Sequence, residues 1–189
     1  FDLVLGRAGD DFAVMGMHFK LGLYEHQSAG ALQALINLIN AKPQILEDQT
    51  GDCIEKMVVR AYEPAFGIIG DPAKRDPKTR QSADHSMLYL VCTTLRKALE
   101  LHSAKKHKSL SWKELMLVPH DFSDKALHDP LTRRLMDKMS FEWGGESYDK
   151  AYPDGIPTSM VITDDQGNTH DSGFIMYPAG HARHANAPT

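Results

Sequence analysis

The chain combines helical and strand-like segments in an order that restricts its fold. Residues 27–40 carry Ala, Leu and Ile on one helical face, and Lys42-Pro43 ends that helix. Residues 53–60 contain the β-branched side chains typical of a strand. Residues 159–163 and 169–176 flank a glycine-bearing loop, which predicts a C-terminal β-hairpin. Together these segments predict an α+β fold, with a mixed or antiparallel sheet and helices packed on it.

A second long helix is predicted to begin at a Ser82 cap and to run to about Leu101. His85 and Tyr89 are four residues apart in that helix and would share one face. The remaining expected elements are part of a strand in 12–20, a helix near 64–70, helices near 112–117, 123–127 and 130–138, and a strand near 138–143.

Length and composition fit one globular domain and exclude several classes of protein. The chain has 189 residues, of which 42% are hydrophobic, and its formal charge of −4 does not favour a nucleic-acid surface. No apolar run approaches the ~20 residues that cross a bilayer. Two cysteines cannot supply the four thiolates of an iron–sulfur cluster. We expect a leader or linker at 1–11, one domain at 12–180 and a tail at 181–189 that is unstructured at its end.

Three segments gather side chains that could bind an anion or transfer a proton: 19–28, 82–89 and 177–184. The first lies just before an apolar helix, whose N-terminus attracts anions, although a simple helix cap is the structural alternative. In the second, the alternative for Tyr89 is a hydrogen bond inside the core. The third could meet a carboxylate or simply coat a surface. No metal-ligand spacing, dinucleotide fingerprint, phosphate loop or nucleophile elbow occurs.

Taken together, these segments resemble the MmgE/PrpD family, the 2-methylcitrate dehydratases. Residues 19–29 (Phe-Lys followed by His-Gln-Ser-Ala) are similar to the segment that opens the smaller domain of that family. Residues 71–89, with Ala-Asp-His-Ser and Tyr89, are similar to its central signature. Residues 177–183 (Tyr-Pro-Ala-Gly-His-Ala-Arg) resemble the segment after its last strand, and 128–130 (His-Asp-Pro) lies in register between the two. These motifs look closest to those of the eukaryotic, mitochondrial branch of the family.

The resemblance implies a smaller α+β lid domain that faces a large helical domain across the active site. Family members convert 2-methylcitrate to 2-methyl-cis-aconitate in propionate catabolism without an iron–sulfur cluster, so no cofactor is expected. Carried over residue by residue, the implied catalytic residues are Lys20, His26 and Tyr89. We expect His85, His181 and Arg183 to bind the substrate, a tricarboxylate with about three negative charges at neutral pH.

Because the chain opens on Phe1, we expect it to be a lid-domain fragment of a hydro-lyase, inactive without the N-terminal helical domain. The resemblance implies a homodimeric, mitochondrial parent protein; without it, a cytoplasmic location is expected. Neither a nucleic acid nor a membrane is expected as a partner. Two alternatives stay open: a domain of the cis-aconitate decarboxylase type, and a non-catalytic binding or antigenic domain of the same fold.

Overall fold

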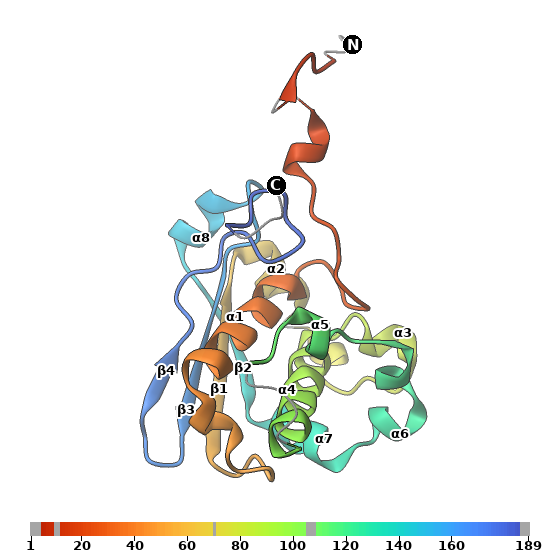
Figure 1. Ribbon diagram of the computed structural model, residues 1–189, viewed down its shortest axis with the longest axis vertical. Helices are drawn as coiled ribbons and strands as arrows, with labels where there is room; N and C mark the ends of the chain where they lie inside the picture. Colours follow the sequence, from red (N-terminus) through yellow and green to blue (C-terminus); the bar gives the residue numbers. More distant parts are fainter. Residues whose placement is uncertain (1–4, 10–11, 70, 105–108, 186–189) are drawn as a thin grey trace.

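The computed structural model describes residues 5–9, 12–69, 71–104 and 109–185 (Figure 1). Its sheet has four strands in the order β2-β1-β3-β4. The strands are β1 (Ile54–Ala61), β2 (Met139–Trp143), β3 (Thr158–Asp164) and β4 (Thr169–Asp171). β2 runs parallel to β1, whereas the β1–β3 and β3–β4 pairs are antiparallel. The predicted α+β fold with a mixed sheet is therefore confirmed.

Helices α1 and α4 pack together over one face of the sheet (Figure 1). The helices are α1 (Ser28–Ala41), α2 (Glu63–Ile69), α3 (Arg80–Ala83), α4 (Met87–Ser103), α5 (Trp112–Leu115), α6 (Asp124–Leu127), α7 (Pro130–Asp137) and α8 (Glu146–Ala151). Short 3-10 turns lie at η2 (Ala13–Gly16), η3 (Pro43–Leu46), η4 (Pro72–Lys74) and η5 (Pro119–Phe122). In the described ranges, no helix is both long enough and apolar enough to span a bilayer.

The apolar faces of α1 and α4 meet the sheet because their buried side chains interlock with those of β1, β2 and β3. Cys92 of α4 lies with its sulfur 4.0 Å from the sulfur of Met139 in β2. Gly30 of α1 lies so close to the start of β3 that an added Cβ would stand 2.4 Å from Thr158 Oγ1. The opposite face of the sheet carries an exposed ion pair between Arg60 and Glu142. The core therefore lies on the helical side of the sheet.

The predicted helix from Ser82 to Leu101 is wrong in one respect, because it is broken into α3 and α4. The Thr79 side chain caps α3 by accepting from Ser82 N. A new cap forms at Ser86, whose Oγ accepts from Tyr89 N at 3.3 Å and donates to Lys74 O at 2.6 Å. His85 precedes this cap, so it does not share a helical face with Tyr89.

The second arm of the predicted hairpin is also shorter than expected. β4 ends at Asp171, and Ile175 forms only an isolated bridge with Thr158. Segment 12–20, expected to be partly strand, contains η2 and a single bridge from His18 to His181. His181 is buried and Ala182 N donates to Met17 O. The expected tail boundary at 181 thus falls inside a packed segment, and residues 186–189 lie outside the described part.

Candidate functional site

A cavity of about 190 Å³ lies where β1 ends, α1 begins and β3 begins. It is called the histidine cavity below. Its lining residues are His18, His26, Gln27, Tyr62, Tyr152, Pro153, Gly155, Ile156 and His181. The packing that fixes Gly30 against Thr158 holds the start of α1 beside the start of β3. The cavity is therefore built where several chain segments meet rather than within one motif.

Three imidazoles meet at this cavity, two from near the N-terminus and one from near the C-terminus. The ring centroid of His18 lies 4.8 Å from that of His26 and 5.9 Å from that of His181. His18 Nε2 donates to the backbone oxygen of Ala179 at 3.3 Å. His181 Nδ1 accepts from Arg183 N at 3.0 Å. Among the described residues, the His26 ring has no hydrogen-bond partner, so its nitrogens are free to meet a ligand.

All three histidines favour the neutral form. Burial and the neighbouring His26 lower the pKa of His18 to about 4. Burial and the charge of Lys20 lower the pKa of His26, and burial and the charge of Arg183 lower that of His181. A neutral imidazole can accept a proton, which makes the unpartnered His26 suited to act as a general base.

Tyr62 adds a phenol to the same cavity. It follows the last residue of β1, and its ring stacks on Tyr152 with centroids 4.4 Å apart. Burial raises its pKa, with further contributions from Tyr152 and Glu25, so the phenol keeps its proton. Within the described part of the chain, its hydroxyl has no hydrogen-bond partner. The cavity lining therefore offers both a protonated phenol and neutral imidazoles.

Two expected cations lie at the edge of the cavity. Lys20 is exposed, and its charge lowers the pKa of His26. No ion-pair partner of Lys20 is found among the described residues. Arg183 forms an exposed ion pair with Asp154 at 2.8 Å, which partly offsets its charge. The structure thus brings Lys20, His26, His181 and Arg183 into one neighbourhood.

Tyr89 and His85 lie elsewhere. The Tyr89 side chain is buried in the core, where its hydroxyl donates to the backbone oxygen of Asp121 at 2.5 Å and its ring packs on Phe122. His85 is exposed and its Nδ1 contacts the carboxylate of Asp84. Its charge acts on Glu25, which is 7% exposed and whose pKa is raised by burial. Neither residue lines the histidine cavity.

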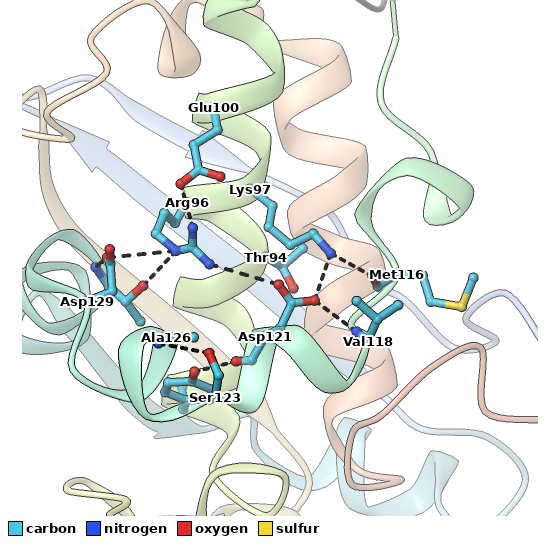
Figure 2. Close-up of polar contacts among 12 residues, drawn as sticks. Thr94, Arg96, Lys97, Glu100, Met116, Val118, Asp121, Ser123, Ala126 and Asp129 are labelled. Atoms are coloured by element: carbon cyan, nitrogen blue, oxygen red, sulfur yellow. Dashed lines mark hydrogen bonds and ion pairs between the residues drawn. The ribbon is translucent and has the colours of Figure 1, made fainter. Parts of the chain in front are cut away.

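A second, larger cavity of about 510 Å³ lies beside α4 and is dominated by ion pairs (Figure 2). The buried Asp121 carboxylate accepts from Lys97 Nζ at 2.9 Å and from Val118 N at 2.9 Å. Arg96 donates to Glu100 at 2.5 Å and lies 3.8 Å from Asp129 and 4.0 Å from Asp121. We call these five charged residues, Arg96, Lys97, Glu100, Asp121 and Asp129, the Asp121 network. Its charges are mutually satisfied.

Three residues of the histidine cavity escaped sequence reasoning: His18, Tyr62 and Tyr152. His18 was read only as part of a strand, and Tyr62 lies in the connection between β1 and α2. A signal for Tyr62 was present, because a side chain that follows a buried strand emerges at the edge of the sheet. No local pattern marks His18, since its partners are His26 and His181, and His181 lies at the other end of the chain.

The described residues contain no group of three or more His, Cys, Asp or Glu placed to hold a metal ion. The lining of the cavity supplies imidazoles and phenols, with cations at its edge. Comparisons of the chain with protein-family models and with curated proteins found no match.

Proposed function

We propose that this chain is the lid domain of a hydro-lyase that dehydrates a tricarboxylate, of the 2-methylcitrate dehydratase type. One observation carries the proposal: His26 and His181, which come from two separate segments of the family resemblance, line the same cavity. Lys20 and Arg183, from the same two segments, supply positive charge at its edge. A tricarboxylate requires such cations and hydrogen-bond donors.

In this proposal His26 is the base and Tyr62 is the acid. The His26 imidazole removes a carbon-bound proton, and the electron pair of that C–H bond forms the new C=C bond. The C–O bond breaks, and the hydroxyl leaves as water with the phenolic proton of Tyr62. Solvent then returns the proton from the imidazolium to the phenolate, so atoms and charge balance. Lys20 holds a carboxylate and stabilises the negative charge that develops beside it.

Tyr62 takes this role in place of Tyr89, which the resemblance suggested. The hydroxyl of Tyr89 is already engaged with the Asp121 carbonyl. A proton donor must come within about 3 Å of the atom that it protonates. Tyr62 lines the histidine cavity, whereas Tyr89 is not among its lining residues.

The rest of the site would be supplied by a helical domain outside these 189 residues. His26 is exposed and Tyr152 is 43% exposed, so one side of the cavity is open to a covering domain. We therefore expect the 189-residue chain alone to give no turnover of 2-methylcitrate. Formation of the unsaturated product by the purified chain, followed by ultraviolet absorbance, would contradict this part of the proposal.

The central test uses the longer parent protein and three variants: His26→Gln, Tyr62→Phe and Tyr89→Phe. Loss of a general acid or base lowers kcat by about 10²- to 10⁴-fold. We expect that loss for the first two variants and less than tenfold for Tyr89→Phe. His128→Gln, at an exposed histidine that does not line the cavity, is the control for folding and yield.

The same assay separates the alternatives. If the parent releases carbon dioxide from cis-aconitate but does not dehydrate 2-methylcitrate, the domain belongs to a decarboxylase. If neither His26→Gln nor Tyr62→Phe lowers turnover of either substrate by tenfold, about 1.4 kcal/mol of barrier, the catalytic assignment fails. The remaining alternative would then be a non-catalytic binding domain of the same fold.

A further inference from the structure

The N-terminal segment, residues 12–20, is held to the body of the protein by few contacts. Two backbone hydrogen bonds join it to the C-terminal segment: Phe19 N donates to Gly180 O at 2.9 Å, and Ala182 N donates to Met17 O at 3.1 Å. Figure 1 shows the chain leaving the body beyond this point. Of the side chains described in residues 12–20, His18 alone is partly buried; the others are exposed. His18 is therefore the anchoring side chain of the segment.

The surroundings of His18 suit a neutral imidazole and oppose a charged one. Its Nε2 donates to Ala179 O, which leaves Nδ1 as the unprotonated nitrogen of the neutral ring. Nδ1 is buried and has no hydrogen-bond partner among the described residues. A proton at Nδ1 would place an unpaired charge in a desolvated position. The rings of His26 and His181 lie 4.8 Å and 5.9 Å from the His18 ring, centroid to centroid, and would be repelled by that charge if they were charged.

The other charged groups near the cluster give His18 little compensation. Lys20 acts on His26, while Arg183 and His184 act on His181, and all three carry or can acquire positive charge. Asp154 is the carboxylate that acts on His181, and it already pairs with Arg183 at 2.8 Å. Tyr62 and Tyr152 also line the cavity, and burial raises the pKa of the Tyr62 phenol, which therefore stays uncharged. Glu25 acts electrostatically on Tyr62, but its buried carboxyl accepts from Ser28 Oγ and burial raises its pKa. Among the described residues, His18 has no ion-pair partner for an imidazolium.

We propose that His18 is an acid-sensitive latch, whose protonation releases residues 12–20 from the C-terminal segment 179–182. The released segment would take His18 out of the wall of the histidine cavity and leave that cavity open. The proposal goes beyond the reaction assigned above, because it depends on the latch contacts and not on any substrate. Loss of dehydratase activity would leave it untouched, and failure of the latch would leave the reaction untouched.

The direction of the pH effect follows from linkage. The pKa of His18 is about 4 in the latched form and returns to its ordinary 6.5 when the segment is free. Latching is therefore at full strength above pH 6.5 and is lost as the pH falls from 6.5 towards 4. For these two values, the latching equilibrium constant falls about 20-fold between pH 7 and pH 5.

Amide hydrogen exchange measured by NMR on the 189-residue chain tests the latch. The amides of Phe19 and Ala182 report the two latch hydrogen bonds, and the amide of Met57, which donates to Lys138 O at 2.8 Å in the sheet, reports the core. After correction for the intrinsic pH dependence of exchange, we expect protection of Phe19 and Ala182 to fall about 20-fold from pH 7 to pH 5. Protection of Met57 should change less than twofold.

Three variants separate the latch from general loosening. His18→Leu keeps a buried anchor without a titratable group, so protection of Phe19 should become independent of pH. Gly180→Ala should remove that protection at both pH values, because Gly180 has φ +93° and a Cβ there would stand 2.1 Å from Phe19 O. His128→Gln, outside the cluster, should behave as the wild type.

The His18 ring can also be titrated directly by NMR in the wild-type chain, which serves if His18→Leu does not fold. A midpoint below pH 5 together with the loss of Phe19 protection supports the latch. A midpoint near 6.5 overturns it, and so does a pH-dependent loss of protection that persists in His18→Leu.

Discussion

The histidine cavity and the Asp121 network are the two polar regions that contrast most in this molecule. The network surrounds the larger cavity, about 510 Å³ against 190 Å³, yet its buried Asp121 is paired with Lys97 and a backbone amide. In the histidine cavity, the rings of His26 and Tyr62 meet other rings but have no hydrogen-bond partner in the described part of the chain. The comparison teaches that unmet hydrogen-bonding capacity, rather than cavity size, distinguishes the cavity proposed to be reactive from the network that stabilises the fold.

The strongest test of this contrast is Asp121→Ala. The variant would leave Lys97, whose side chain is 16% exposed, without its carboxylate partner. It would also remove one of the three carboxylates that lie near Arg96. Breaking a buried ion pair costs about 3–5 kcal/mol, and we expect that loss in the free energy of unfolding measured with urea. The matched control is Glu146→Ala, which removes an exposed pair with Lys150 and should cost under about 0.5 kcal/mol. Equal effects of the two variants would contradict the structural role of the network.

The next effect concerns the packing beneath the histidine cavity. In Gly30→Ala the new Cβ would stand 2.4 Å from Thr158 Oγ1 and 2.9 Å from Ile156 O, so α1 and β3 would have to move apart. Overpacking of this kind costs about 1–3 kcal/mol, partly offset by the better helix propensity of Ala. We expect a lower melting temperature and altered NMR shifts at His26. Unchanged stability would show that α1 and β3 can separate without cost, and that the cavity does not depend on this contact.

The two tyrosines give a smaller and more direct comparison. Tyr89→Phe leaves the buried Asp121 carbonyl without a donor, which should lower the free energy of unfolding by about 1–2 kcal/mol. Tyr62→Phe removes a hydroxyl with no partner among the described residues, so its cost should stay within about 0.5 kcal/mol. Urea denaturation of both variants in parallel measures the difference. A larger loss of unfolding free energy in Tyr62→Phe than in Tyr89→Phe would contradict this assignment of the two hydroxyls.

The smallest effect is expected at Glu25, whose buried carboxyl accepts from Ser28 Oγ at 3.1 Å. Its pKa is raised above 4.5 in the folded state, so the folded protein binds this proton more tightly than the unfolded chain. The contribution to stability is therefore full below pH 4.5 and is lost as the pH rises through the folded value. Glu25→Gln keeps the acceptor for Ser28 and removes the charge. We expect it to be more stable than the wild type at pH 7, by up to about 1 kcal/mol, and equal to it at pH 4.

Elements with local signals were predicted closely. Helix α1 was expected at 27–40 and spans Ser28–Ala41, and strand β1 was expected at 53–60 and spans Ile54–Ala61. Apolar periodicity and Pro43 identify the helix, and β-branched residues identify the strand, without reference to any other part of the chain. The His26 and His181 side chains were likewise chosen from their own segments.

The failures occurred where a distant partner decided the structure. Ser82 and Ser86 are both good helix caps, and no local rule chooses between them. The carbonyl of Lys74, which accepts from Ser86 Oγ, helps to fix the break. A distant partner also decides the place of Tyr89. Its hydroxyl donates in the core to the carbonyl of Asp121, 32 positions further along the chain.

The sequence by itself determined the α+β class and the positions of the main elements, because each depends on spacing within a few turns of chain. It suggested two of the cavity histidines, His26 and His181, only through the family resemblance. Only the tertiary structure decided which side chains face one another. It brought His18, Tyr62 and Tyr152 to the cavity and drew Tyr89 into the core. The physical reason is that burial and hydrogen-bond satisfaction are properties of the packed chain, so the free groups of a site appear only after all other polar groups have found their partners.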